Sequence, residues 1–179
     1  MKKTTKTSII SAVMATAFLV SAPSAVAHEH KKPQPKLPMN VVDYYKAPQG
    51  LQISDADKKR VTEAVLKASE GWKSAFNRGD AAGAANQYEE GAVMTAMPFG
   101  IFIGKVSIQA FWTNIIGQGF DDVKYMGTKL EVVSGDAAIV SASWEMNNAY
   151  GIITKELWVL QKDGSAKLRV DDFEIVGAK

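Results

Sequence analysis

The chain has 179 residues, no cysteine, two histidines and a formal net charge of +2. The lack of cysteine excludes disulfides, thiol catalysis and thiolate metal sites, so the core alone must stabilise the fold. Residues 1–27 hold three lysines and no acid, which leaves 18 basic against 19 acidic side chains in the rest of the chain. This near-neutral remainder has no basic stripe, and we therefore expect no nucleic-acid partner.

Residues 1–27 have the pattern of a secretory signal peptide. Three lysines precede an apolar run over residues 9–20, and Ala25-Val26-Ala27 offers the small residues that a signal peptidase reads. The run is shorter than the roughly twenty residues of a membrane span. We expect cleavage after Ala27, a periplasmic or secreted protein, and no membrane partner after cleavage.

Residues 28–53 follow as a predicted tether, because their proline and lysine content cannot bury much apolar surface. Cleavage after Ala27 would leave His28-Glu29-His30 at the new N-terminus. The free amine of His28, two backbone amides and the imidazole of His30 can bind Cu²⁺ or Ni²⁺ in a square plane. The alternative is a polar tether in which both histidines are incidental.

Residues 54–179 are predicted to form one domain that begins with helices. Ser54 followed by Asp57 is typical of a capped helix start. Gly79 suits the end of this helix, and Asp80 suits the N-cap of a second helix through Tyr88. Apolar residues at steps of three and four predict about six turns for the first helix: Val61, Val65, Ala68, Trp72, Ala75 and Phe76.

A short strand is predicted for residues 92–97, and a third helix follows with the same apolar spacing from Ile108 to Ile116. The period then changes to two, which predicts strands at residues 123–134, 137–146, 152–161 and 166–175. Two tight turns, at Gly135-Asp136 and Asp163-Gly164, join these strands as hairpins. Helices first and a strand meander second predict an α+β fold, with three N-terminal helices packed on an antiparallel sheet.

The ordered motifs of this body resemble those of the nuclear transport factor 2-like superfamily. They include residues 72–80 at the first helix junction, then Gly135-Asp136-Ala137-Ala138, and Asp163-Gly164 leading to Asp171. The closest resemblance is to the SnoaL-like and ketosteroid-isomerase-like branch. It implies a cone-shaped domain whose strongly curved sheet encloses an apolar pocket, and it implies a homodimer.

The residues that carry out steroid isomerisation in that branch are only partly present. Thr95-Ala96-Met97-Pro98 occupies the segment that holds the family's catalytic carboxylate, and it offers no proton acceptor. Trp72 stands where the isomerase has a tyrosine. Glu156 matches the isomerase's protonated aspartic acid, whose pKa is raised by the apolar site around it. We do not expect the steroid reaction.

Glu156 is the first candidate catalytic residue. Strand alternation places it on one face with Thr154 and Trp158, and we expect this face to border the pocket, where burial would raise the pKa of Glu156. The alternative is that the faces are reversed and that Glu156 is solvated or paired with a lysine.

Asp171 is the second candidate. Because successive residues of a strand face opposite ways, either Asp171 or Asp172 must point inward, and the family resemblance favours Asp171. An inward Asp171 beside Glu156 could share a proton with it or position a water molecule. The alternative is a carboxylate held by backbone donors or by Arg169.

Aromatic side chains and one methionine are predicted to line the pocket, with Met97 and Phe99 at its mouth. The candidate ligand-binding residues are Trp72, Phe76, Tyr88, Met97, Phe99, Trp112, Trp144 and Trp158. The alternative is that they form only a core, since burial by itself stabilises a fold.

Three functions remain open. The first is an exported pocket protein that binds a small, largely apolar molecule. The second is a cofactor-independent acid–base enzyme, of isomerase, hydratase or cyclase type, that uses Glu156 or Asp171. The third is a dimeric interaction module without a ligand. None of these hypotheses requires a cofactor.

The export hypothesis predicts that the protein recovered from the periplasm or medium begins at His28. The intact mass of that protein measures this directly. With His28 first, the chain should bind Cu²⁺ tightly, and one extra residue before His28 should abolish this binding because the terminal amine is displaced. Equal Cu²⁺ binding by the extended chain would contradict the proposed ligands.

Overall fold

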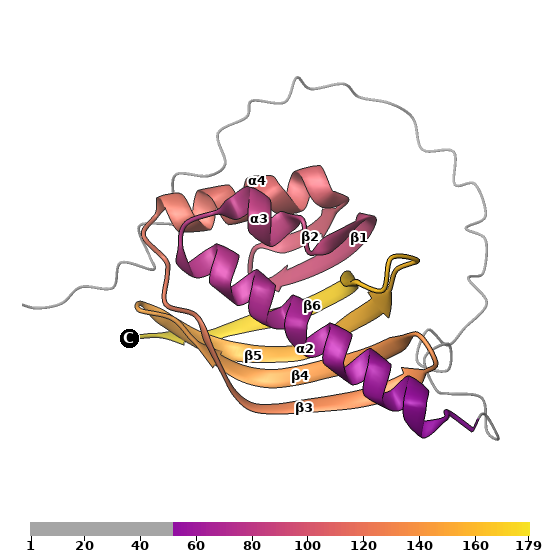
Figure 1. Ribbon diagram of the computed structural model, residues 1–179. Coiled ribbons are helices and arrows are strands. Elements are labelled where there is room, and N and C mark those ends of the chain that lie inside the picture. Colours follow the sequence, from indigo (N-terminus) through magenta and orange to yellow (C-terminus); the bar gives the residue numbers. More distant parts are fainter. Residues whose placement is uncertain (1–51) are drawn as a thin grey trace, which may run out of the picture. The chain divides into compact units, whose positions relative to one another are not determined.

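The computed structural model describes residues 52–179 (Figure 1). The predicted signal peptide, His28, His30 and nearly all of the predicted tether lie outside these residues. In the described part, the element order is helix, helix, two strands, helix and four strands. No helix in residues 52–179 is long and apolar enough to cross a membrane.

The first described helix, α2, spans Asp55–Asn77 and starts where the sequence predicts. Ser54 caps it, because its hydroxyl accepts a hydrogen bond from the backbone N–H of Asp57 at 3.1 Å. One stripe of the helix is buried: Val61, Val65, Ser69, Trp72, Ala75 and Phe76. The predicted apolar face is thus the face that packs on the sheet.

The second helix, α3, is a short segment spanning Ala81–Ala85. Asp80 caps it as predicted, accepting a hydrogen bond from the backbone N–H of Gly83 at 2.7 Å. The prediction that this helix continues through Tyr88 was wrong. Tyr88 instead begins a strand, where its backbone pairs with Leu168 and its side chain is completely buried.

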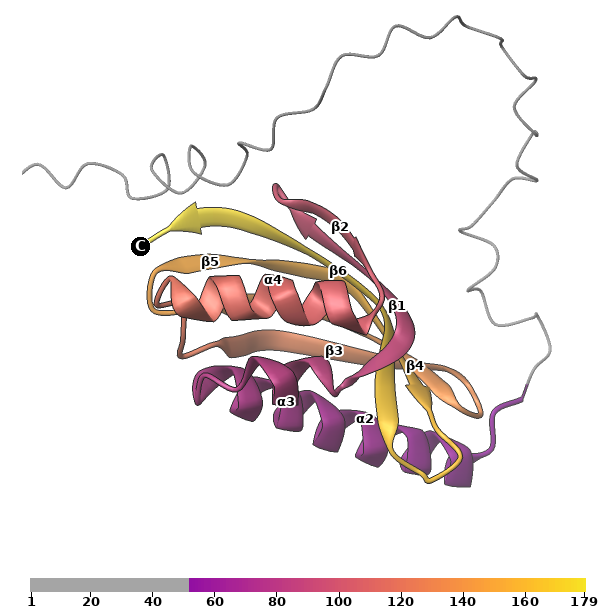
Figure 2. The same cartoon turned by 90° about the horizontal axis from the view of Figure 1, so that it is seen from above.

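The third helix, α4, spans Lys105–Gly117 and buries Ile108, Phe111, Trp112 and Ile115. It packs against the first two strands of the sheet, whereas α2 packs across the last four, and α3 lies between the two helices. All three helices therefore cover one face of the curved sheet, as Figures 1 and 2 show.

The sheet has six strands in the order β2-β1-β6-β5-β4-β3. Their bounds are β1 Tyr88–Met97, β2 Gly100–Ile103, β3 Lys124–Ser134, β4 Ala137–Glu145, β5 Ala149–Leu160 and β6 Ala166–Ala178. The α+β class and the four-strand meander are confirmed. Two features differ from the prediction: β2 is an additional strand, and β1 pairs with β6 in parallel while every other pair is antiparallel.

An irregularity in β5 decides which of its side chains point inward. Thr154 is an extra residue there, because its neighbours Ile153 and Lys155 pair with consecutive residues of β6. A bulge of this kind interrupts the alternation of faces. Glu156 is therefore buried although Thr154 is exposed, and the prediction that both share one face was wrong.

A second irregularity lies in β6, where Arg169 is the extra residue. Leu168 and Asp171 are three positions apart, yet both are buried in the main core region of the fold. Val170 packs instead on the small apolar cluster of Leu157 and Val159 on the other face of the sheet. The bulge therefore turns Asp171 toward the helices.

Gly151 on β5 permits a close approach that no larger residue would allow. A Cβ at this position would lie 2.0 Å from the backbone oxygen of Glu174 and 2.5 Å from Cζ2 of Trp144. Gly151→Ala should therefore lower the free energy of unfolding by about 2 kcal/mol or more, because backbone or indole must move. Denaturant unfolding monitored by circular dichroism measures this change. Gly91→Ala is the control, since its Cβ would meet no atom within 4 Å; equal stability of both variants would contradict the proposed close packing.

Candidate functional site

Two carboxyl groups lie side by side in the interior of the domain. Glu156 on β5 and Asp171 on β6 are directly paired across the two strands, and only 2% and 4% of their surfaces are exposed. Both line one cavity, together with Trp72, Trp112, Val123, Tyr125, Trp144, Met146, Ile153 and Phe173. The structure therefore brings together the two residues that the sequence predicted as the acid pair.

Each acid is held by hydroxyl or indole donors rather than by a basic side chain. The Tyr88 hydroxyl donates to Oδ2 of Asp171 at 2.6 Å. Glu156 accepts from the Tyr125 hydroxyl at 2.9 Å and from Nε1 of Trp158 at 2.8 Å. Neither acid takes part in any of the ion pairs found within residues 52–179.

The basic side chains that could have paired with the two acids form ion pairs with other carboxylates instead. Arg169, the predicted alternative donor to Asp171, forms an ion pair with Glu89 at 2.7 Å. Asp172 points to the other face of β6 and pairs with Lys155 at 3.1 Å. The inward acid is thus Asp171, as expected, and its neighbour is an outward ion-pair partner.

Burial changes the ionisation of the pair. Loss of hydration raises the pKa of Glu156 to about 7, although the hydrogen bonds from Trp158 and Tyr125 act in the opposite direction. Burial also raises the pKa of Asp171 well above its ordinary value, and the nearby charge of Glu156 raises it further. The pair therefore retains a proton near neutral pH, when an exposed acid would be fully ionised.

The aromatic side chains around the acids pack against one another. The rings of Trp72 and Trp112 meet edge to face with centroids 5.1 Å apart, and Phe173 stacks on Trp112 at 5.7 Å. Trp144 meets Phe173 edge to face at 6.3 Å. These contacts join helices α2 and α4 to strands β4 and β6 above the two acids.

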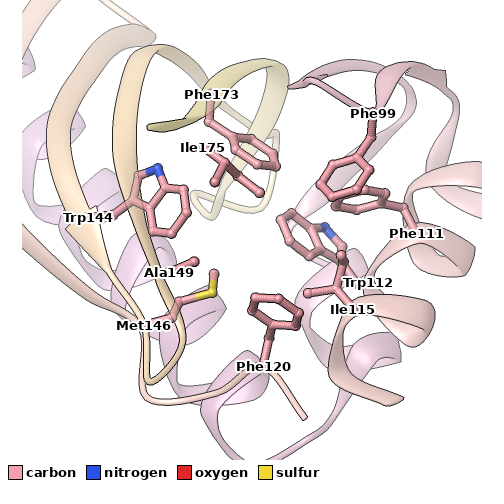
Figure 3. A pocket seen from close by; sticks show the side chains of 10 residues that line it. All are labelled: Phe99, Phe111, Trp112, Ile115, Phe120, Trp144, Met146, Ala149, Phe173 and Ile175. Atoms are coloured by element: carbon pink, nitrogen blue, oxygen red, sulfur yellow. The ribbon is translucent and has the colours of Figure 1, made fainter. Parts of the chain in front are cut away.

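A second cavity adjoins the first and shares Trp112, Trp144, Met146 and Phe173 with it. In Figure 3, Phe99, Phe111 and Trp112 face Trp144 and Met146 across this space. Phe99, which is 37% exposed, lies in the turn between β1 and β2 and marks its outer edge. Each cavity has a volume of about 20 Å³, which is room for about one water-sized group.

Three indole N–H groups in this region lack a partner. Nε1 of Trp72, of Trp112 and of Trp144 is buried and forms no hydrogen bond within the described residues. Trp112 also lies near the Tyr88 hydroxyl; burial and Asp171 raise the pKa of that tyrosine well above its ordinary value, and Trp112 acts in the opposite direction. A buried donor without an acceptor costs about 1–3 kcal/mol, so three in one place are uncommon in a core that serves stability alone.

The other predicted pocket residues lie in two different environments. Phe76, Tyr88 and Trp158 are fully or almost fully buried behind the cavity walls. Trp158 and Tyr88 support the acids through their hydrogen bonds. Met97 is 49% exposed and lines neither cavity.

Sequence reasoning missed Tyr125 and Phe173, which both line the acid-containing cavity. The signal for Tyr125 was present, because it follows the buried Val123 by two positions and so shares its face. His28 and His30 lie outside the described residues. Within residues 52–179, no group of three or more potential ligand side chains is arranged to hold a metal ion.

The raised pKa of Glu156 predicts how stability depends on pH. The unfolded chain releases this proton near pH 4.5, whereas the folded chain retains it until about pH 7. The Glu156 carboxyl should therefore lower the free energy of unfolding by about 2 kcal/mol between pH 5 and pH 7.5, and Asp171, whose pKa is also raised by burial, adds to this decrease. Glu156→Gln should remove the Glu156 share and make this part of the curve less steep, as measured by urea unfolding at each pH.

Glu89→Gln is the control for this measurement. The pKa of Glu89 is lowered, first of all by its hydrogen bond to Arg169, so its contribution to stability is lost only as the pH falls below the ordinary carboxyl range. The slope between pH 5 and pH 7.5 should remain in this variant. A wild-type curve that is flat over this range would contradict the buried, proton-retaining pair.

Comparison with known proteins identifies the fold. No family model matches the chain, and no curated protein matches it, but many solved structures do. A hexachlorocyclohexane dehydrochlorinase from Novosphingobium barchaimii aligns with a TM-score of 0.59 and 14% identity, over 70% of this chain and 93% of that chain. A ketosteroid isomerase-like protein from Erwinia carotovora atroseptica has a TM-score of 0.57 and 16% identity, over 64% and 95% of the two chains.

A third structure, a nuclear transport factor 2-like protein of unknown function from Shewanella oneidensis, has a TM-score of 0.54 and 18% identity, over 63% of this chain and 98% of that chain. These identities are low, so the likeness concerns the fold alone. Proteins with this fold include enzymes as well as proteins without an assigned reaction. The described part of the chain has the nuclear transport factor 2-like fold, with its curved sheet and covering helices.

Proposed function

We propose that this protein binds a small molecule in the aromatic cavity, with the polar end of the ligand at Glu156 and Asp171. The observation that carries the proposal is the acid pair itself. Two carboxyl groups are buried next to each other, face a cavity and take part in none of the ion pairs found within residues 52–179. Such an arrangement destabilises the empty fold, so a gain in function must offset it.

The third hypothesis, an interaction module with a filled interior, gains support from the small cavities. Spaces of about 20 Å³ are far below the several hundred Å³ of a site for a drug-sized ligand. Against this hypothesis stand the acids and the three unpartnered indole donors. A core that only packs is more stable with apolar groups at such positions.

The buried acid pair and the small cavities are both explained if the ligand is compact. The adjoining cavities run from the half-exposed Phe99 to the acids, and they share Trp112 and Phe173 as a common wall. A molecule with a short apolar body and one polar end can occupy this path with modest rotation of the rings. The indole N–H groups would then find acceptor atoms on water that enters with the ligand.

A second candidate function is acid–base catalysis without a cofactor. It is favoured by the burial of Glu156 at the cavity, which raises the pKa of this carboxyl to about 7 and so suits a group that both accepts and donates a proton at neutral pH. Glu156 or Asp171 would move the proton, and Tyr88 and Tyr125 would position the two acids. The dehydrochlorinase among the similar structures has the same fold, but its reaction is not transferred by that likeness.

We also propose that the protein is exported and forms a homodimer, in keeping with the sequence. The signal-peptide pattern of residues 1–27 supports export. The family resemblance supports the dimer.

The binding proposal predicts a small molecule retained by the purified protein. Native mass spectrometry should show a mass excess that disappears on denaturation. Asp171→Asn should reduce the retained fraction at least tenfold, because it changes the group at the polar end of the ligand. Asp172→Asn is the matched control, since Asp172 is the next residue but faces outward and pairs with Lys155.

The same variants separate binding from catalysis. Once the retained molecule is identified, the enzyme candidate predicts turnover that Glu156→Gln or Asp171→Asn reduces at least a hundredfold while some binding remains. Unchanged rates in both variants would exclude the enzyme candidate. Full retention of the molecule by both variants would exclude Glu156 and Asp171 as its polar contacts, and a purified protein that retains no molecule would contradict the binding proposal itself.

A further inference from the structure

The cavity around the acid pair contains no positive charge. Five of its ten lining residues are aromatic, two are acids, and none is a lysine, arginine or histidine. The basic group whose charge acts on Glu156 is Lys73, which lowers the pKa of this acid against the larger effect of burial. The Lys73 ammonium lies 5.2 Å from the centroid of the Tyr125 ring and pairs with Glu70 at 2.6 Å, so its charge already has partners.

The aromatic walls of this cavity and the two acids at its floor both attract a positive charge. The face of an aromatic ring carries partial negative charge and attracts a cation within about 6 Å of its centre. Trp72, Trp112, Trp144, Tyr125 and Phe173 present five rings in one small space. Glu156 and Asp171 add up to two negative charges where little water is present to screen them.

We infer that the polar end of the ligand is a compact organic cation, an alkylammonium group that binds between Glu156 and Asp171 with its alkyl chain among the tryptophan rings. This inference rests on the proposed function and specifies the class of its ligand. The ammonium hydrogens would donate to carboxylate oxygens that the two tyrosines and Trp158 leave available, since a carboxylate can accept several hydrogen bonds. Positive charge would also relieve the repulsion that two adjacent carboxylates impose on each other.

Binding of such a cation must be linked to proton release. Three groups donate hydrogen bonds to the acids: Tyr88 from β1, Tyr125 from β3 and Trp158 from β5. Two further charges act without a hydrogen bond. Lys73 from α2 lowers the pKa of Glu156, and Asp172 of β6 raises the pKa of Asp171. Both tyrosines have pKa values raised well above the ordinary value by burial and by the acids, so they stay protonated. The proton that leaves therefore comes from the acid pair.

The competing ligand class is an uncharged molecule with a carbonyl or hydroxyl oxygen. Such a molecule would accept hydrogen bonds from the protonated pair and from the indole N–H groups, and its binding would weaken as the pair ionises. The two classes thus predict opposite effects of pH on affinity. This difference makes the inference testable on the unmodified protein.

The experiment is isothermal titration of the mature full-length chain with butylammonium and with 1-butanol, its uncharged analogue, at pH 6 and pH 8. The inference expects butylammonium to bind at least tenfold more tightly than 1-butanol. It also expects the affinity for butylammonium to rise about tenfold from pH 6 to pH 8, with proton release at pH 6 detected in buffers of different ionisation enthalpy. Tighter binding of 1-butanol, or butylammonium affinity that falls with rising pH, would overturn the inference.

Variants then locate the bound cation. Asp171→Asn and Glu156→Gln should each weaken butylammonium binding at least tenfold, whereas Asp172→Asn should leave it unchanged. Circular dichroism of each variant shows whether it is folded, and the pH and proton-release measurements need no variant at all. Equal binding by all three variants would overturn the assignment of the acids.

The outcomes distinguish this inference from the proposed function. If 1-butanol binds and Asp171→Asn weakens its binding, the pocket proposal stands and only the cation is wrong. If neither probe binds and no molecule is retained in native mass spectrometry, the pocket proposal itself fails and the inference fails with it.

Discussion

The burial of Glu156 beside Asp171 is the constraint on which the rest of this structure depends. Two neighbouring carboxyl groups in a dry interior repel each other when ionised, and the fold accommodates them by keeping a proton on the pair. Tyr88, Tyr125 and Trp158 supply the hydrogen bonds that such a pair requires. Strands β1, β3 and β5 thus contribute hydrogen-bond donors to a single polar centre on the inner face of the curved sheet.

The aromatic layer above the acids serves both stability and access. Contacts among Trp72, Trp112 and Phe173 join helices to strands, and they account for the small size of the two cavities. The same layer leaves three indole donors without acceptors in the described part of the chain. Close packing and incomplete hydrogen bonding in one place are therefore the two features that the proposed ligand must accommodate.

The fold is shared with enzymes, but the fold alone does not fix where the acids of this chain lie. Ala96 and Met97 occupy the segment where the resemblance to ketosteroid isomerases places a base, and Ala96 is fully buried while Met97 is half exposed. The two buried acids, Glu156 and Asp171, lie instead on β5 and β6. A common architecture therefore does not identify a reaction, and the side chains on the inner face must be considered individually.

Local signals in the sequence were sufficient for the helix starts at Ser54 and Asp80 and for the strand meander, because capping and alternation act over a few residues. Alternation alone left Asp171 and Asp172 equivalent, and it was the family resemblance that favoured Asp171 as the inward acid. Local signals did not predict the parallel pairing of β1 with β6, since the two strands are distant in sequence. The bulges at Thr154 and Arg169 also depend on long-range pairing, because an extra residue is defined only against a partner strand. The sequence by itself thus determined the class of fold and the identity of the acids. Only the tertiary structure decided that the acids meet, which donors hold them and how little space lies before them, because each of these results from packing between segments far apart in the chain.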